Sequence, residues 1–323
     1  LAAARVFDSS APEDIPLVEY TRREGLVYYL GDELKKFNDP AFHQSLLDDF
    51  RPDAFVAITT IGCQPLPGLR FDAPLWADIH GYVAAEGQLL AERRQDNHYV
   101  RHFWKRYHEA VYLADKFSVT SSVQRHAMIG ELGALGRLNA YTTGYEFVVN
   151  IPLARPDEEI KSEKAIVRGK QTPQDAFILL WLGGYNHWSD PETLFHGIES
   201  AMEQNERIHF VSTGGRIDGC DEKSFPKLQA LVEKSRFKDR FHFQGWVESD
   251  DIPAYLCEAD AGINVDRLCY ESEFGARHRI VEMLRAAVPV ITTRISEISR
   301  EVEQAEAGLV CPVQSPEALA KCI

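Results

Sequence analysis

Short apolar runs alternate with longer amphipathic stretches along the whole chain. In the first half, runs of aliphatic and β-branched residues predict strands at 54–60, 75–79, 116–120 and 147–151. Apolar residues at helical spacing predict helices at about 31–49 and 97–114, and Ser121 is placed to cap a further helix. Strands that alternate with helices are typical of parallel sheets flanked by helices.

A charged segment, DEEIKSEKAIVRGKQTPQD at 157–175, has the composition of an exposed connection between domains. We therefore predict two domains, 1–153 and 154–323. In the second domain the pattern predicts strands at 176–182, 207–213, 240–244, 261–265 and 288–292. It predicts helices between and after them at 190–204, 224–235, 251–258, 275–287 and 296–304. This order describes a doubly wound domain, in which ligands bind beyond the carboxyl ends of the strands.

Charge and composition narrow the class of protein. The chain has 35 Lys and Arg against 49 Asp and Glu, a net charge of −14, which argues against a protein that grips nucleic acid by charge. Its six cysteines stand singly, without the spacing of a zinc site or a disulfide framework. No apolar run is long enough to span a bilayer, and no signal peptide is evident. We expect a soluble cytoplasmic protein without a transmembrane segment, bound metal or nucleic-acid partner.

The segment ESEFGARHRIVEMLRAAVPVIT, at 271–292, carries the strongest chemical signal. A glycine at a helix start, Gly275, lets the backbone approach a phosphate, and Arg277 or Arg279 could add a charged contact. Glu282, two turns further, could accept two hydrogen bonds from a ribose diol. The alternative is a solvated helix in which Arg279 pairs with Glu282 at i,i+3.

ESEFG and VEMLRAAVPVIT resemble the carboxylate-glycine-helix-carboxylate motif of retaining GT-B glycosyltransferases of family 4, with two extra residues before Glu282 and Ala287 in place of a glycine. WLGGYNHWSDPETLFHGIESA and FQGWVESDDIPAYLCEADAGINV resemble other parts of its nucleotide-sugar domain. The resemblance implies two Rossmann-like domains facing each other across a cleft, the first for the acceptor and the second for the donor. It further implies transfer from a nucleotide-sugar with retention and without a metal or cofactor, to a glycan, a lipid-linked sugar or a small molecule.

The same resemblance assigns roles to residues. Glu282 would hold ribose, and Glu273 or Glu271 would contact the donor sugar together with His80, so that His80 and Glu273 are the catalytic candidates. The backbone at Gly183 and Gly184 would approach the diphosphate. The family commonly supplies an Arg and a Lys from that loop, whereas this chain has Asn186 and its neighbours there. The phosphate charge would then fall to Arg216, Arg277 and Arg279.

Each of these residues also has a plainer interpretation. Gly183 and Gly184 are compatible with a simple tight turn, and His80 with a structural histidine. The missing cations in the loop leave a second hypothesis, a catalytically silent GT-B-like domain that binds or assembles within a larger protein. A nicotinamide-dependent oxidoreductase is disfavoured because no GxGxxG follows a strand. Residues 1–30 show no strand and glycine-rich loop, and we expect the sequence to be part of a longer polypeptide.

Overall fold

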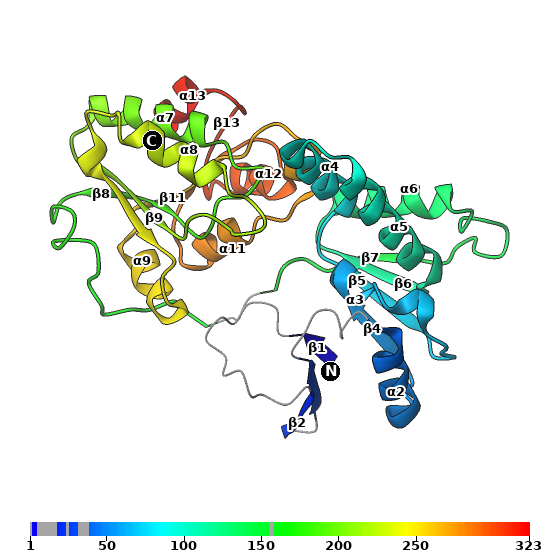
Figure 1. The fold of residues 1–323 in the computed structure, drawn as a ribbon. Coiled ribbons are helices and arrows are strands. Elements are labelled where there is room, and N and C mark those ends of the chain that lie inside the picture. Colours follow the sequence, from blue (N-terminus) through cyan, green and yellow to red (C-terminus); the bar gives the residue numbers. More distant parts are fainter. Residues whose placement is uncertain (1, 5–17, 24–25, 32–38, 155–157) are drawn as a thin grey trace. The chain divides into compact units, whose positions relative to one another are not determined.

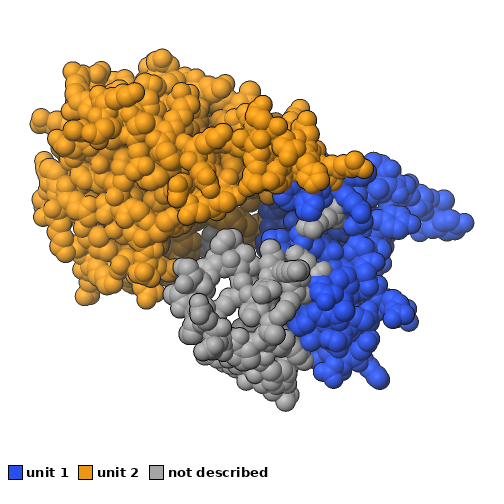
Figure 2. Space-filling view, in the orientation of Figure 1, with its two compact units in different colours: residues 1–83, 102–119, 125–149 blue, residues 84–101, 120–124, 150–323 orange. Residues whose placement is uncertain are grey.

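The computed structural model describes residues 2–4, 18–23, 26–31, 39–154 and 158–323. These residues form two compact units, coloured separately in Figure 2. Unit 1 comprises Leu1–Val83, His102–Val119 and Arg125–Val149, and unit 2 comprises Ala84–Arg101, Thr120–Gln124 and Asn150–Ile323. Unit 2 thus contains two short segments of the first half besides the whole second half.

Unit 2 is built on a six-stranded parallel sheet in the order β10-β9-β8-β11-β12-β13. Its strands are β8 (Phe177–Trp181), β9 (Ile208–Thr213), β10 (Phe241–Gly245), β11 (Ala261–Asn264), β12 (Val290–Thr293) and β13 (Gly308–Cys311). The chain proceeds outward from β8 to β10 and then returns to place β11 on the other side of β8. The order therefore reverses between β8 and β11, and the carboxyl ends of these two strands define the crevice where such sheets bind ligands.

Helices cover both faces of this sheet (Figure 1). One core contains buried residues of α7 (Pro191–Gln204), α8 (Ser224–Val232) and α13 (Pro316–Cys322). The other contains buried residues of α9 (Ile252–Glu258), α11 (His278–Arg285) and α12 (Glu297–Gln304). β8 feeds both, since Leu179 and Trp181 enter the first core while Ile178 and Leu180 enter the second. This alternation explains why the strand reads as a continuous apolar run.

The predicted strands and helices of the second half are present, with three differences. β13 was not predicted, because GLVC is short and begins with Gly308, whose Cβ would lie 1.9 Å from the Val290 carbonyl oxygen. The predicted helix 275–287 starts instead at His278. Gly275 ends a short preceding helix, α10 (Tyr270–Phe274), and is extended (φ −70°, ψ 135°). The remaining short helices are 3₁₀ turns at Lys238–Arg240 and Ser249–Asp251.

Unit 1 contains a four-stranded sheet in the order β4-β5-β6-β7. Its strands are β4 (Phe55–Ile58), β5 (Leu75–Ile79), β6 (Lys116–Val119) and β7 (Val148–Asn150), all within the predicted ranges. The helices of the first half are α2 (Pro40–Phe50), α3 (Thr59–Gly62), α4 (Val83–Arg94), α5 (His98–Leu113) and α6 (Ser122–Ala134), with a 3₁₀ turn at Leu66–Gly68. Ser121 accepts a hydrogen bond from the Gln124 amide (3.2 Å) at the start of α6, which confirms its predicted capping role.

The sequence predicted no strand in residues 1–30, and this was wrong where the structure describes them. β1 (Ala2–Ala4), β2 (Val18–Arg23) and β3 (Leu26–Gly31) form a sheet in the order β1-β3-β2, with β2 and β3 antiparallel. The helix predicted from residue 31 is described only from Pro40, after Asp39 caps it; residues 32–38 lie outside the described residues. Among the helices described, none is both long and apolar enough to cross a membrane.

Candidate functional site

Three neighbouring strands of unit 2 end at glycines in the left-handed region. These are Gly183 after β8 (φ +82°), Gly214 after β9 (φ +86°) and Gly245 at the end of β10 (φ +70°). A Cβ on Gly214 would lie 2.4 Å from the carbonyl carbon of Gly183, and the Gly214 amide donates to the Gly245 carbonyl (2.5 Å). Next to Gly183 and Gly245 a Cβ would meet only open space. The strand ends therefore present bare backbone that a ligand can approach closely.

Arg279 of α11 crosses to the end of β8. Its Nη2 donates to the Gly184 carbonyl (2.5 Å), and its guanidinium lies 4.2 Å from the centroid of the Trp181 ring. Its Nη1 is buried and has no hydrogen-bond partner among the residues that the structure describes. Burial lowers the pKa of Arg279 to about 10, against the opposing effect of Asp266, so the group is charged at neutral pH. One donor of this cation is unused beside the exposed backbone.

Arg277, two residues earlier, lies in a closed cluster of charges. Its Nε donates to Asp266 (2.7 Å), and its Nη1 and Nη2 donate to the two carboxylate oxygens of Glu271 (3.1 and 2.9 Å). All three residues are buried. Burial alone would lower the pKa of Arg277, but the two carboxylates raise it above its ordinary value. The predicted phosphate contact of Arg277 would have to compete with both of these ion pairs.

The same cluster explains the glycine of the motif. A Cβ on Gly275 would lie 2.2 Å from Arg277 Nη1 and 2.3 Å from Glu271 Oε1. Gly275 is extended and Arg277 is non-helical (φ −100°, ψ 85°), so Arg277 turns back to Glu271 and Asp266 and α11 starts only at His278. Gly275 is thus required by the packing of the ion pairs, whatever further role its backbone has.

The remaining predicted donor residues are spread around the ends of the strands. Glu282 lies on α11 and pairs with Arg285 (2.6 Å). Arg216 follows β9; its exposed side chain pairs with Asp218 (2.7 Å), and its carbonyl accepts from the Trp246 indole (3.2 Å). Trp246 also bounds Gly184, where a Cβ would lie 2.9 Å from its ring.

Two carboxylates and a histidine were predicted to contact the sugar. Glu271 is held in the buried cluster, whereas Glu273 is exposed and lines a pocket of about 530 Å³ beside Arg267 and Tyr270. His80 belongs to unit 1, where it follows β5 and its Nε2 lies 2.6 Å from Asp78 Oδ2. The role of each of these residues stays a prediction.

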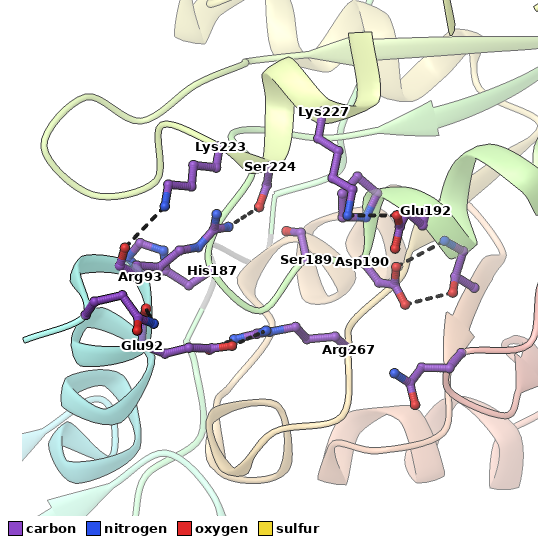
Figure 3. Close-up of a pocket in the computed structure, with 14 residues that line it drawn as sticks. Glu92, Arg93, His187, Ser189, Asp190, Glu192, Lys223, Ser224, Lys227 and Arg267 are labelled. Atoms are coloured by element: carbon purple, nitrogen blue, oxygen red, sulfur yellow. Dashed lines mark hydrogen bonds and ion pairs between the residues drawn. The ribbon is translucent and has the colours of Figure 1, made fainter. Parts of the chain in front are cut away.

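A second pocket, of about 520 Å³, lies beside the loop that follows β8 (Figure 3). Arg93 at the end of α4 reaches Asp221 (2.7 Å) and Ser224 (2.6 Å) at the start of α8. Burial alone would raise the pKa of Asp221, but the nearby His187 and hydrogen bonds from Ser224 hold it well below its usual range. A further segment of the chain meets α4 here through the ion pair of Arg267 with Glu92.

Sequence reasoning did not single out the cations of this pocket, Arg93, Lys223, Lys227 and Arg267. They come from segments separated by up to 174 positions. Asn186, a predicted donor-site residue, does not line this pocket: its backbone amide donates to Ser189 Oγ (3.1 Å), and its Oδ1 lies 3.7 Å from the thiol of Cys220. Arg93 and Arg94 carry only the local signal of basic residues in the last turn of a helix, which complements the helix dipole without any ligand.

Comparison with known proteins finds similarity to glycosyltransferases. Residues 176–323 match the family described as glycosyl transferases group 1. A GDP-Man:Man(3)GlcNAc(2)-PP-Dol alpha-1,2-mannosyltransferase of Dictyostelium discoideum is 25% identical over 178 residues, which are 50% of this chain and 34% of that protein. This chain thus spans about a third of the length of that curated relative.

Solved structures resemble the chain over nearly its whole length. Sucrose-phosphate synthase from Thermosynechococcus elongatus is 16% identical with a TM-score of 0.66, over 96% of this chain and 76% of that one. The UDP-forming α,α-trehalose-phosphate synthase from Burkholderia xenovorans, in complex with glucose-6-phosphate, is 12% identical with a TM-score of 0.69, over 99% and 85%. Anabaena HepE in complex with UDP is 14% identical with a TM-score of 0.59, over 87% and 70%. The chain has the GT-B fold with Rossmann-like domains, and its similarity to the glycosyl transferases group 1 family covers residues 176–323.

Proposed function

We propose that this protein transfers a sugar from a nucleotide-sugar donor to an acceptor. One observation carries the proposal: Arg279 lies across the end of β8 with an unused, buried Nη1, beside the open backbone at Gly183. A diphosphate is the part of a nucleotide-sugar that needs both a cation and free backbone amides. The switch point of a doubly wound sheet is where such a group binds.

The proposal assigns the other predicted residues around this anchor. Glu282 holds the ribose, and Arg216 and Asn186 lie on the loops that border the diphosphate. Glu273, the carboxylate that faces a pocket, contacts the sugar together with His80. Preorganised cations and backbone dipoles stabilise the leaving diphosphate in place of a metal, and the anomeric configuration is retained. The singly spaced cysteines support a reducing compartment, the cytoplasm.

Calorimetric titration with UDP, GDP, ADP and CMP tests the donor site. We expect one nucleotide to bind the wild type, and Arg279→Gln to weaken it about 10- to 100-fold, because a hydrogen bond to a charged group contributes about 1.5–3 kcal/mol. Lys234→Gln, a matched loss of positive charge at an exposed position after α8, should bind as the wild type does. If the folded protein binds no nucleotide at all, the silent binding module is the better hypothesis.

Retention and independence of metal need a separate measurement. With the sugar conjugate of the nucleotide that binds, proton NMR of the product should show the anomeric configuration of the donor. Chelation with EDTA should leave the initial rate unchanged. An inverted product, or a rate that EDTA abolishes and a divalent cation restores, would contradict the respective part of the proposal.

A further inference from the structure

We propose that Arg93, Arg94, Lys223 and His187 form a second anion site, which receives a phosphate group carried by the acceptor. The inference rests on the proposed transferase function for the identity of its ligand. The geometry of the site itself does not depend on that function. All four residues belong to unit 2 and surround a cavity of about 320 Å³.

The cavity has cations that no carboxylate neutralises. Arg94 donates to the Tyr99 hydroxyl (2.5 Å) and to the Gly219 carbonyl (3.2 Å), and Lys223 Nζ donates to the Arg93 carbonyl (3.2 Å). Neither has an acidic partner among the described residues. Glu222 is the one acidic residue in the lining, and its carboxylate accepts from the Gly219 amide (3.3 Å). Positive charge gathers here although the whole chain carries −14.

His187 supplies a buried polar group without a strong partner. Its side chain is only 7% exposed. Nδ1 lies 3.5 Å from Asp221 Oδ2 without a hydrogen bond to any described residue, and Nε2 lies 3.8 Å from the thiol of Cys220. Buried polar side chains normally have a hydrogen-bond partner at shorter range. An oxyanion in the cavity would supply that partner.

Arg93 fixes the wall between this cavity and the larger pocket of Figure 3. Arg93 lines both cavities, as do His187 and Lys223. Its Nη2 donates hydrogen bonds to Asp221 and Ser224 (Figure 3). Guanidinium groups from one helix end and an ammonium from the facing loop suit a tetrahedral, multiply charged oxyanion such as a phosphate. The larger pocket beside it, lined by Ser189, Glu192 and other polar groups, has room for the rest of a phosphorylated, hydroxyl-rich molecule.

The donor diphosphate is proposed to bind at the other end of the same loop. Gly184 lies against Ile217, Trp246 and Arg279, whereas His187 lies beside Cys220 and Asp221. The residues assigned to the diphosphate line neither pocket. Two anionic groups therefore have separate sets of donors, one for the donor and one for the acceptor.

The test titrates the full chain at low ionic strength with inorganic phosphate and with a hexose 6-phosphate, and separately with the nucleotide that the wild type binds. We expect Arg94→Gln and Lys223→Gln each to weaken binding of the hexose phosphate at least 10-fold, with nucleotide affinity unchanged. Lys234→Gln, the matched charge control, should bind both ligands as the wild type does. Two separate variants guard against a loss of folding in either one, which melting temperatures would report.

Each outcome decides the proposal. Equal phosphate affinity in wild type and pocket variants would overturn the site. Loss of nucleotide affinity in the same variants would assign these cations to the donor and overturn a second site. Hexose phosphate binding no tighter than inorganic phosphate would overturn the acceptor role and leave a site for free anions. Phosphate binding that the variants abolish, in a protein that binds no nucleotide, would support the anion site and overturn the proposed transferase function.

Discussion

The carboxyl ends of β8 and β11 are neighbours at the switch point, yet they are built in opposite ways. The end of β8 is bare backbone with one arginine, Arg279, that keeps an unused donor. The end of β11 is filled by Asp266 and Glu271, which both pair with Arg277. Arg277 and Arg279 are two residues apart in one motif. Arg279 can bind a ligand because no carboxylate of the described residues is paired with it, whereas Arg277 stabilises the fold because it is already paired with two.

The largest expected effect is on the closed cluster. Arg277→Met leaves Asp266 and Glu271 buried without their partner, so we expect the free energy of unfolding to fall by about 3–5 kcal/mol. Arg279→Met removes one hydrogen bond and one ring contact, and should cost about 1–2 kcal/mol. Urea unfolding followed by circular dichroism measures both. Equal losses in the free energy of unfolding would contradict the different roles of the two arginines.

The glycine-lined end of β8 offers a second test. Gly214→Ala forces a side chain into a φ of +86° and against the Gly183 backbone, and we expect a loss of about 1–3 kcal/mol in the free energy of unfolding. Gly130→Ala is the matched control, because its Cβ would meet only open space on helix α6 and should stabilise by up to about 1 kcal/mol. If Gly214→Ala unfolds like the wild type, the close packing of the strand ends is not needed.

The sequence could predict the sheet of unit 2 because its signals are local. The run at β8 and the Asp190-Pro191 start of α7 are each readable within a few residues. β13 was missed because only four residues carry it, and its glycine is required by contact with Val290 rather than by its own segment. The alternation of strands and helices predicts a parallel sheet, whereas the strand order and register were not predicted.

The site was predictable only in part, because sequence signals are local whereas the contacts that define the site are not. Gly275 and Arg277 stand in a motif, so the sequence marks them, but their roles depend on which carboxylates they meet in space. The partner of Arg277 in Asp266 is invisible to any pattern of spacing. Arg94 and Lys223 are 129 positions apart and become one site only when α4 meets the loop before α8. Local patterns identify which residues are charged, while the fold decides which charges stay unpaired.

The smallest expected effect lies at the amino-terminal ends of the strands in the same sheet, near the starts of β9 and β10. His209 Nδ1 is 3.1 Å from His242 Nε2, and burial, with smaller contributions from His242 and Arg240, lowers the pKa of His209 to about 4. Burial lowers the pKa of His242 as well. Because both favour the neutral form in the folded state, stability is complete above the unfolded pKa near 6.5 and falls as the pH drops toward about 4.

Melting temperatures between pH 7.5 and 4.5 test this pair. The fall with decreasing pH should be shallower in His209→Gln than in the wild type, while His196→Gln, on the exposed side of α7, should keep the wild-type slope. A saturating nucleotide should raise the melting temperature without changing that slope, because the proposed donor site lies at the other ends of these strands. A nucleotide that flattens the slope would instead show that the amino-terminal and carboxyl ends of the strands are energetically coupled. The charges at the two ends would then not act independently.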